Sequence, residues 1–562
     1  MPHHRSVLQW LIATGRVLLV GTVSSRRQST AEGFAVLTAS NLVVRLIGFV
    51  YVLPLTHLIG NVGNGLYGVG YQIYIFLFIL SNTGLPSAIA KAVSENRAVG
   101  DYESAHLVFK IALRILLVMG TATTAMMAAA AFWVDRYLWP RTLYTILALS
   151  PTLFFVSLMS GFRGYFQGMS LMTPTGVSQV VEQTVKAVSA PLLAYVFLGY
   201  GIEVAAGGAT FGTTLGAIVG LAYLIAKYLK ERPRILRDIE LHQQMPRRHS
   251  SKSLFRTVIR YAIPITLGSA VLSMGNLVDL ALVGSRLRAA GFSQVETDAL
   301  YGILNTQNAR LVNLPTALST ALAAALLPGI SAAFAAKDRS ALNYRTTQAL
   351  KVSMLIAAPA SIGLSLLSDP VIRVLFPSHP DGGYVLAVGA LSIVFISLVQ
   401  VITAVLQGAG KMHLPPMFLL CGVGIKSLLT YLLVSIPELN IRGAAIASVV
   451  AYSLVFLADL SALTISTGVK IPVTEVFVRP TAAAGLMGIA VWVLSEIMRA
   501  YQASSLVTVA VCVPAGVVVF GLLVIVLKAI TPSELLRLPG GSLMLRTIVR
   551  LGIWKDEESR LH

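Results

Sequence analysis

Two arginines lie inside long apolar segments of the sequence, where a charge is costly. Arg45 stands in the middle of residues 33–59, and Arg310 lies about ten residues into a second apolar segment, 300–334. A helix rises 1.5 Å per residue, so Arg45 lies about 18 Å into a helix that crosses about 30 Å of hydrocarbon. A charge at that depth costs about 2.5–3.5 kcal/mol on insertion scales, so we expect both side chains to face protein or water.

The arginine side chain suits a phosphorylated ligand. A guanidinium donates two parallel N–H bonds to phosphate oxygens. Arg45 and Arg310 also fall at similar depths of two separate segments. The pair therefore predicts a binding site for a diphosphate. The alternative is structural: each arginine would tie two helices together through carbonyl groups or a carboxylate.

Two lysines and two carboxylates in other apolar segments complete the candidate site. Lys186 and Lys426 occupy equivalent positions of an internal repeat and are expected to bind the same diphosphate. Glu182 and Asp279 are expected to form a coupling network of charges, with Asp279 binding a cation or an arginine. Glu182 precedes Lys186 by four residues, which places both on one face of a helix. An ion pair between these two, which lowers the cost of insertion, is the alternative to a proton- or ion-sensitive switch.

The sequence also lacks several motifs. No GxxxxGK[ST] phosphate-binding loop occurs, because Gly410-Lys411 is followed by Met412. No HExxH motif or paired CxxC motif is present, so we expect no metal site. The longest stretch outside the apolar segments, residues 230–253, is too short for a catalytic domain. Cys421 and Cys512 both lie in apolar segments, where a disulfide framework is not expected.

The composition indicates a membrane protein with many spans. The chain has 562 residues, of which 56% are hydrophobic and 12% are charged. A soluble protein of this size could not bury so much apolar surface. The net charge of +19 does not indicate nucleic-acid binding, because the basic residues lie between the apolar segments. We expect an all-α integral membrane protein with about fourteen transmembrane helices.

The basic residues also predict the orientation in the cell membrane. Most of the 43 lysines and arginines share one side of the membrane when the N-terminus is inside, and ten of them lie between Lys227 and Arg260. Cytoplasmic segments carry such an excess. Because the expected number of spans is even, both termini are predicted to lie in the cytoplasm.

An internal repeat divides the apolar segments into two six-helix lobes. FQG at 166–168 precedes Lys186 at the same distance at which LQG at 406–408 precedes Lys426, and LPSAIAKAV at 85–93 matches LPGISAAFA at 327–335. Transporters often combine two like-oriented halves, with a site between them near the midplane. The expected parts are a cytoplasmic N-terminal segment (1–32), an N-lobe (33–229), a basic cytoplasmic loop (230–253), a C-lobe (254–467), two extra helices (468–529) and a cytoplasmic tail (530–562).

Glycine spacing points to two places of close helix contact. Glycines at 208, 212, 216 and 220 recur every four residues and predict a packing ridge. A second group, at 60, 63, 65, 68 and 70, suggests a tight or mobile gate.

Several blocks of the sequence resemble one group of transporters. They are RLIGFVYVLPLTHLIG at 45–60, GLPSAIAK at 84–91, SGFRGYFQGMSLMTPTGVSQVVEQ at 160–183 and NLPTALSTALAAALLPGISAAF at 313–334. These blocks are similar to the MurJ-like lipid II flippases and the stage V sporulation protein B-like polysaccharide exporters. Both groups belong to the multidrug/oligosaccharidyl-lipid/polysaccharide, MATE-like superfamily. The resemblance covers about residues 30–530.

The resemblance implies a V-shaped bundle of two lobes with inward- and outward-open states, and a lipid groove formed with the two extra helices. It implies that Arg45 and Arg310 bind the diphosphate of a lipid-linked precursor. The family's second arginine in the first span aligns near Tyr51 and Val52, so this sequence departs from the pattern there. Our hypothesis is that Lys186 and Lys426 compensate.

The sequence and the resemblance together predict a flippase and not an enzyme. It would move an undecaprenyl-diphosphate-linked cell-wall precursor, similar to lipid II, from the inner to the outer leaflet by alternating access. No cofactor is expected, and a Na⁺ or H⁺ gradient or the membrane potential would drive transport. The expected partners are the lipid-linked glycan, membrane lipids and cell-wall synthesis proteins, and the protein is expected to be a monomer.

Other functions stay open from the sequence. The nearest is export of another lipid-linked polysaccharide, such as a teichoic, capsular or spore-wall unit. A multidrug or cation antiporter of the same superfamily would need an acidic cavity. A membrane glycosyltransferase or ligase would need exposed catalytic carboxylates or a large outer loop. A scaffold for a cell-wall complex would use the basic loop and the tail.

Overall fold

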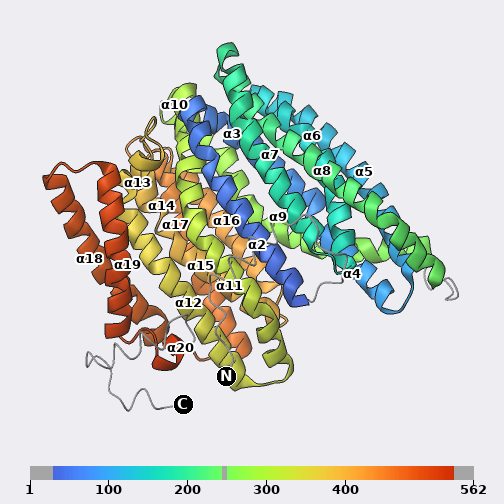
Figure 1. Ribbon diagram of the computed structural model, residues 1–562. Coiled ribbons are helices and arrows are strands. Elements are labelled where there is room, and N and C mark those ends of the chain that lie inside the picture. Colours follow the sequence, from blue (N-terminus) through green and yellow to red (C-terminus); the bar gives the residue numbers. More distant parts are fainter. Residues whose placement is uncertain (1–29, 243–249, 537–562) are drawn as a thin grey trace. The chain divides into compact units, whose positions relative to one another are not determined.

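The computed structural model describes residues 30–242 and 250–536, and the regular structure of these residues is helical throughout (Figure 1). Ten helical stretches in this part of the chain are long and apolar enough to cross a membrane. Four other long helices are not among the ten: α2 (Thr30–Val50), α7 (Thr173–Phe197), α9 (Ser251–Ala289) and α11 (Ala309–Ala335). The predicted all-α membrane class is confirmed, and the number of fourteen spans stays a prediction.

Parts of the expected terminal and loop segments lie outside the described residues. They are residues 1–29 of the N-terminal segment, 243–249 of the basic loop and 537–562 of the tail. The sequence predicts a loop over 230–253, but α8 (Ile202–Leu241) continues through the first half of that stretch.

The described residues form two compact units. Unit 1 contains residues 30–59 and 69–273, and unit 2 contains residues 60–68 and 274–536. The helix α3 (Val52–Asn82) contributes to both units and is interrupted at Gly60, whose φ of 63° is left-handed. The later boundary between the units falls within α9.

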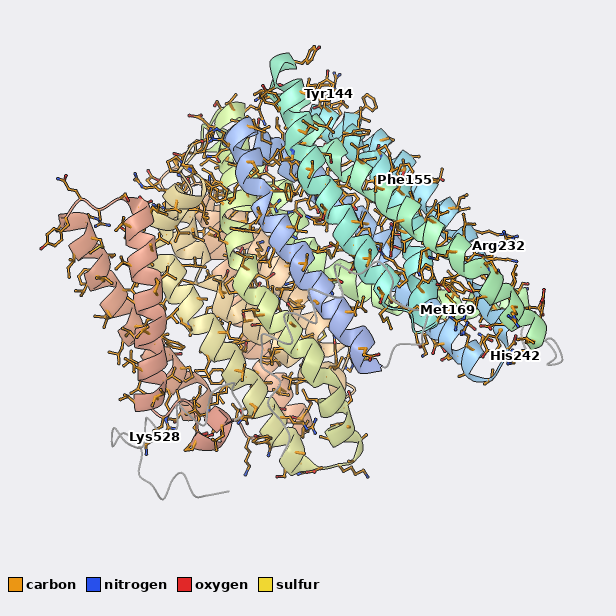
Figure 2. All side chains as sticks on the ribbon, viewed as in Figure 1. Tyr144, Phe155, Met169, Arg232, His242 and Lys528 are labelled. Atoms are coloured by element: carbon orange, nitrogen blue, oxygen red, sulfur yellow. The ribbon has the colours of Figure 1, made fainter. Side chains whose placement is uncertain are left out.

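Unit 1 is built around α6 (Leu143–Gly168) and α8. α6 packs against α4 (Gly84–Ala98), α5 (Tyr102–Trp133) and α8, and α8 packs along α7. In its core the ring of Phe109 stacks on that of Tyr165 with a centroid distance of 4.3 Å, and Tyr228 contacts both. A π-helical turn, η1 (Val134–Leu138), follows α5, and a 3₁₀ turn, η2 (Leu198–Tyr200), follows α7. Figure 2 shows Tyr144 and Arg232 toward opposite ends of this unit.

The predicted glycine ridge of α8 is a packing surface. A Cβ atom on Gly212 would lie 2.7 Å from the backbone nitrogen of Ala190, and a Cβ on Gly216 would lie 2.6 Å from the carbonyl oxygen of Glu182. Both neighbours are backbone atoms of α7, which cannot move aside as a side chain can. The small residues therefore let α7 and α8 approach closely, as small-xxx-small faces do in membranes.

Unit 2 has its core between α11, α12, α15 and α17. Ile330, Leu350, Ile402 and Leu463, one from each of these helices, are fully buried in one apolar cluster. The helices of this unit after α9 and besides α11 are α10 (Gln294–Gly302), η3 (Ile303–Asn308), α12 (Arg339–Leu366), α13 (Ser368–Leu375), α14 (Gly383–Gly389), α15 (Ser392–Gly408), α16 (Leu414–Leu433), α17 (Arg442–Thr467), η4 (Thr474–Val478), α18 (Arg479–Ala500), α19 (Ser505–Val526) and α20 (Pro532–Leu536). α18 packs on α12 and on α19.

The internal repeat is visible in the turns that end equivalent helices. After α6 and α15, Ser170 and Gly410 both have positive φ, 60° and 75°. The next N–H group in each turn donates to a carbonyl five residues back, to Phe166 in the first turn (2.9 Å) and to Leu406 in the second (2.8 Å). This is the hydrogen-bond pattern of a helix that ends in a left-handed residue.

A second pair of turns also matches. α4 is followed by Gly100 (φ 80°) and α11 by Lys337 (φ 54°). The next residues, Asp101 and Asp338, cap α5 and α12, and each carboxylate accepts a backbone N–H at 2.9 Å. Local geometry therefore supports two repeated copies, as the sequence spacing predicts.

Gly212→Ala should destabilise the protein, because the new methyl group meets the backbone of α7. Overpacking of this kind costs about 1–3 kcal/mol. Thermal unfolding in detergent would measure the loss. Gly363→Ala is the matched control, since a Cβ there meets nothing within 4 Å. Equal stability of the Gly212→Ala variant and the wild type would contradict the close α7–α8 contact.

Candidate functional site

Five of the six charged residues singled out in the sequence lie on the four long helices outside the set of ten, and the sixth, Lys426, lies on one of the ten. Arg45 is on α2, Glu182 and Lys186 are on α7, Asp279 is on α9 and Arg310 is on α11. Lys426 is on α16. The first three of these residues belong to unit 1 and the other three to unit 2.

Arg45 presents an exposed guanidinium. It follows the start of α2 by 15 residues, or about 22 Å of helix. Its side chain is exposed, and neither a hydrogen bond nor an ion pair of Arg45 occurs within residues 30–242 and 250–536. All of its donors are therefore available to a ligand.

α2 packs against α7 within unit 1. A Cβ atom on Gly48, one turn after Arg45, would lie 3.2 Å from Nε2 of Gln183 on α7. Gly176 of α7 approaches the side chain of Ser40 in the same way. The structure thus brings the helix that carries Arg45 against the helix that carries Glu182 and Lys186.

Lys186 is buried among aromatic side chains. Only 4% of the residue is exposed. Its Nζ donates to the hydroxyl of Tyr71 at 3.2 Å and lies 4.4 Å from the centroid of that ring, and 5.5 Å from the centroid of Tyr51. Ring faces attract a cation electrostatically, most strongly where water is excluded. Tyr51 is one of the two residues near which the resemblance places the family's second arginine, and its ring lies beside Lys186.

Glu182 binds Arg163, a partner that the sequence analysis missed. Nη2 of Arg163 donates to Oε2 of Glu182 at 2.8 Å, and Nε of Arg163 donates to Oγ of Ser178 at 3.0 Å. Arg163 comes from α6, in the FRGYFQG block. The spacing between Glu182 and Lys186 pointed to a partner on the same helix, whereas this partner comes from the neighbouring one.

Lys426 and Asp279 form an ion pair in unit 2. Nζ of Lys426 donates to Oδ2 of Asp279 at 2.8 Å and to the carbonyl oxygen of Gly275 at 3.3 Å. The side chains are 9% and 16% exposed. The partner of Asp279 is therefore a lysine of the same unit, and its expected role in coupling stays a prediction. The two lysines at equivalent repeat positions therefore differ: Lys186 lies against tyrosine rings and Lys426 against a carboxylate.

Arg310 follows a π-helical turn and a buried polar network. η3 (Ile303–Asn308) directly precedes α11, and such turns occur often at functional sites. Nε2 of Gln307 donates to Oδ1 of Asn61 at 2.9 Å and to the carbonyl oxygen of His379 at 2.8 Å, and Asn61 donates to Asp381 at 3.1 Å. Arg310 itself is partly buried.

The second glycine group lies in the segment that carries Asn61, one member of this network. Gly65 lies against the backbone of Asp298, and Gly302 lies against the backbone of Asn61. A Cβ at either glycine would collide with the facing backbone, so residues 60–68 pack tightly on α10 within unit 2. The sequence analysis noted these glycines as a tight or mobile gate, but it did not identify Gln307 or Asp381.

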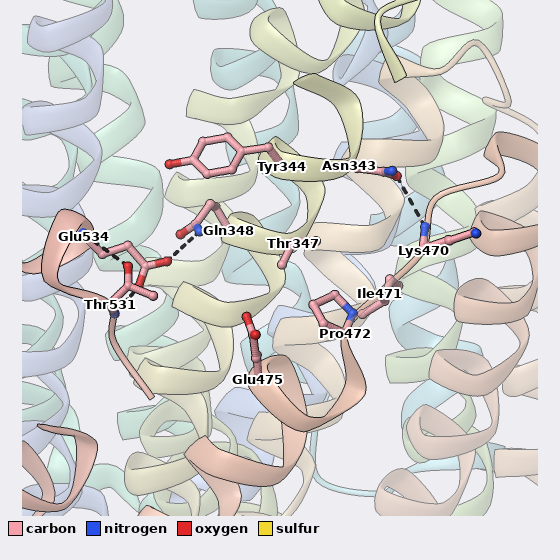
Figure 3. A pocket seen from close by; sticks show the side chains of 10 residues that line it. All are labelled: Asn343, Tyr344, Thr347, Gln348, Lys470, Ile471, Pro472, Glu475, Thr531 and Glu534. Atoms are coloured by element: carbon pink, nitrogen blue, oxygen red, sulfur yellow. Dashed lines mark hydrogen bonds between the residues drawn. The ribbon is translucent and has the colours of Figure 1, made fainter. Parts of the chain in front are cut away.

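A cavity of about 570 Å³ lies beside α12 in unit 2 (Figure 3). Its lining combines polar and apolar side chains and comes from separate parts of the chain. The residues that line it are Asn343, Tyr344, Thr347, Gln348, Lys470, Ile471, Pro472, Glu475, Thr531 and Glu534.

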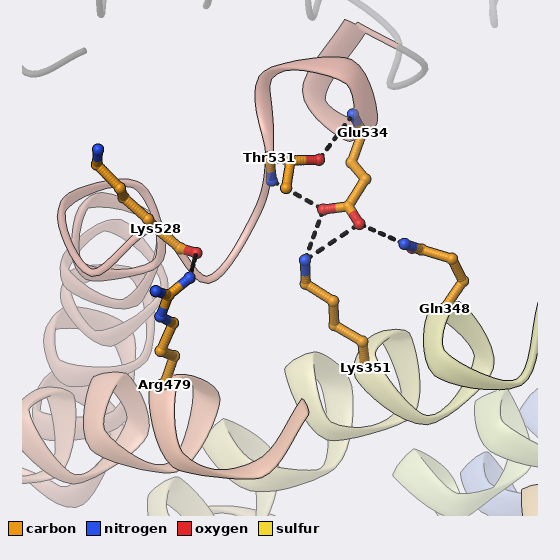
Figure 4. A network of polar contacts seen from close by, with 6 residues as sticks. All are labelled: Gln348, Lys351, Arg479, Lys528, Thr531 and Glu534. Carbon is orange, nitrogen blue, oxygen red and sulfur yellow. Dashed lines mark hydrogen bonds and ion pairs between the residues drawn. The ribbon is translucent and has the colours of Figure 1, made fainter. Parts of the chain in front are cut away.

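Glu534 at the edge of this cavity holds the segment after α19 against α12 (Figure 4). Its carboxylate accepts from Nζ of Lys351 at 2.8 Å, from Nε2 of Gln348 at 2.6 Å and from the backbone N–H of Thr531 at 2.8 Å. Burial by itself raises the pKa of this carboxyl, but the hydrogen bonds from Lys351, Thr531 and Gln348 outweigh it and bring the pKa below the ordinary value. Lys351 is 3% exposed, so its ammonium depends on Glu534 for a counter-charge.

Taken together, these features define a class of protein. Repeated helical units, ten apolar helical stretches in the described residues and charges buried inside helical bundles characterise a multi-pass membrane transporter. Comparison with known proteins gives the family. Residues 30–334 match the model described as polysaccharide biosynthesis protein, and residues 264–432 match the MatE model. The chain belongs to the polysaccharide biosynthesis protein family.

Two relatives from Bacillus subtilis (strain 168) cover most of the chain. Stage V sporulation protein B is 28% identical over 527 residues, which are 91% of this chain and 98% of the relative. Lipid II flippase MurJ is 30% identical over 443 residues, which are 75% of this chain and 80% of the relative. The protein is therefore a membrane flippase or transporter related to both, and not an enzyme.

Solved structures show the same fold. The structure described as lipid II flippase MurJ in an inward closed conformation has a TM-score of 0.66 and 15% identity, and covers 87% of this chain and 98% of that one. An inward-facing multidrug resistance MATE family transporter has a TM-score of 0.59 and 19% identity, over 75% of this chain and 98% of that one.

Asp279→Asn should destabilise unit 2 by roughly 3 kcal/mol, because it leaves the ammonium of Lys426 buried without a counter-charge. The double variant Asp279→Asn with Lys426→Met should recover most of that loss, since no charge then remains. Unfolding of the wild type, both single variants and the double variant in detergent forms the cycle that measures the coupling. Additive losses would show that the two side chains do not interact.

Glu534→Gln should lower the free energy of unfolding by about 3 kcal/mol at neutral pH, because Lys351 loses its partner. The folded-state pKa of Glu534 lies below its ordinary value of 4.5, so the stabilisation is present above that value and is lost as pH falls through the folded-state pKa. The difference between wild type and variant should therefore shrink below about pH 4.5. Unfolding measured across a pH series checks this.

Glu475→Gln is the matched control, because Glu475 lines the same cavity and is exposed. It should leave stability unchanged at every pH. If the difference in free energy of unfolding between the wild type and Glu534→Gln were as large in acid as at neutral pH, the ionised carboxylate could not be the cause of that difference.

Proposed function

We propose that this protein is a flippase for a lipid-linked glycan carrying a diphosphate, most closely a lipid II-like precursor, moved from the inner to the outer leaflet by alternating access. The observation that carries the proposal is the guanidinium of Arg45, exposed on a long helix and lacking a partner within the described residues. A fixed fork of donors recognises phosphate oxygens in pairs. The relationship to a lipid II flippase at 30% identity supports the same substrate class.

Arg310 and Lys186 are the further anion ligands in this proposal. Both are cations on long helices, and Nζ of Lys186 lies 4.4 Å from the ring centroid of Tyr71 and 5.5 Å from that of Tyr51. Lys426 differs from these two residues, because Asp279 already neutralises its charge. In this scheme Lys426 reaches the diphosphate only when its ion pair opens.

A second candidate substrate is a spore-wall or other polysaccharide unit on the same kind of lipid. The match to stage V sporulation protein B, at 91% of this chain, is longer than the match to the flippase MurJ at 75%. Export of organic cations fits less well, because the carboxylates of Glu182 and Asp279 are each bound to a basic side chain.

Arg45→Ala should reduce flipping about tenfold or more, because it removes charge-assisted hydrogen bonds worth roughly 1.5–3 kcal/mol. Arg45→Lys should retain part of the activity, since it keeps the charge but loses the fork. Flipping of fluorescently labelled lipid II in proteoliposomes measures this. Unfolding in detergent should be nearly unchanged, because Arg45 has no hydrogen bond or ion pair within the described residues to lose.

Arg499→Ala is the control, an exposed arginine whose partner Glu496 is on the same helix. Full flipping by the Arg45→Ala variant would refute the diphosphate role. Depletion of the protein in cells, followed by identification of the undecaprenyl-linked intermediate that accumulates, decides between a lipid II-like unit and another glycan.

A further inference from the structure

A carboxylate that the site above does not use lies inside unit 2. Asp459 is on α17, one of the ten helices able to cross a membrane, and has no exposed surface. Neither Oδ1 nor Oδ2 of Asp459 has a hydrogen-bond partner within the described part of the chain. Most buried carboxylates are paired or hydrogen-bonded, so this arrangement needs an explanation.

Buried apolar residues flank Asp459 on its face of α17. Val455 and Leu463, one turn before and one turn after it on the same face of α17, are 4% and 0% exposed. Gly422 of α16 lies directly against the side chain of Val455, so the two helices are in close contact one turn from Asp459. An ionised carboxylate without partners in such a place is very costly, and protonation removes that cost.

The helices that pack on α17 offer no free charge to stabilise an ionised Asp459. These are α14, α15 and α16. α15 has no titratable side chain. α14 has one, Tyr384, and Cζ of Arg442 lies 4.6 Å from the centroid of its ring. On α16, Lys426 is bound to Asp279.

Three further titratable groups lie on α16 or η4. On α16, the ring centroid of Tyr431 lies 4.3 Å from Cζ of Arg286, and Cys421 is exposed. η4 reaches α17 through contact between the rings of Phe477 and Phe456, and its Glu475 is exposed. Tyr452 and Arg442 are the other titratable residues on α17 itself.

We propose that Asp459 is a proton-binding site that couples transport to the proton gradient. The carboxyl group is neutral in the conformation described here, and it releases its proton to water in a conformation that exposes this face of α17. The step is a simple exchange, in which the O–H bond breaks, the proton passes to water and a carboxylate remains. The coupling role rests on the proposed transport function, whereas the protonation does not.

A proton suits this position better than a metal ion. A bound Na⁺ or divalent ion would need several oxygen ligands around the carboxylate. Both oxygens of Asp459 are bare, and within residues 30–242 and 250–536 no group of three or more histidine, cysteine, aspartate or glutamate residues could hold a metal ion. A proton needs no such cage.

The first test reads the protonation state directly. Infrared spectra of the full-length protein at neutral pH, in Na⁺-free buffer, should contain the C=O stretching band of a buried carboxylic acid. Asp459→Asn should remove that band, and Asp369→Asn, an exposed aspartate paired with Arg373, should leave it in place. Absence of an Asp459-dependent band, or its loss when Na⁺ replaces K⁺ at constant pH, would overturn the proposal.

The second test reads coupling. In proteoliposomes that flip labelled lipid II, an imposed proton gradient should change the rate severalfold for the wild type and for Asp369→Asn, and should have no effect on Asp459→Asn. An undiminished response of Asp459→Asn would overturn the coupling role. If even the wild type fails to flip lipid II, the proposed substrate is wrong, and the infrared band still decides whether Asp459 holds a proton.

Discussion

A charge placed among apolar helices needs a partner, because hydrocarbon supplies neither water nor counter-ions. This protein meets that requirement in several ways. Lys426 is neutralised by Asp279, whereas Lys186 at the equivalent repeat position lies against tyrosine rings. Glu182 is neutralised by Arg163 from the neighbouring helix. The same backbone plan is thus kept in both units, while the means of stabilising a buried cation differs between them.

The sequence predicts well the features that depend on residues close together in the chain. The repeat offset pairs two turns that each contain a residue with left-handed φ, Ser170 in one and Gly410 in the other. Such a turn is determined by a few consecutive residues. The spacing of the α8 glycines predicted a packing ridge, because a helix returns to the same face every four residues. Membrane class followed from composition alone. In each case the physical cause lies within a single helix or turn.

Partners across the fold were not predictable in this way. Gln307 and Asn61 are separated by 246 residues, and Lys351 and Glu534 by 183. No local pattern in the sequence indicates which two distant polar residues will be in contact. In the sequence, Asp459 is one residue of a long apolar segment, and whether a carboxylate has a partner is visible only when its neighbours are in place. For the same reason Glu182 was first considered with Lys186, four residues away, and not with Arg163.

The exposed guanidinium on α2 has a consequence for the bilayer in the proposed flippase. A bilayer responds to a charge at hydrocarbon depth by local thinning, and water and lipid phosphates are drawn inward toward it. Such hydration exists before any substrate arrives, so a sugar-bearing headgroup would enter a region that is already wet. In the proposed flippase, we therefore expect the transport rate to depend on the thickness of the bilayer and on the charge of its headgroups.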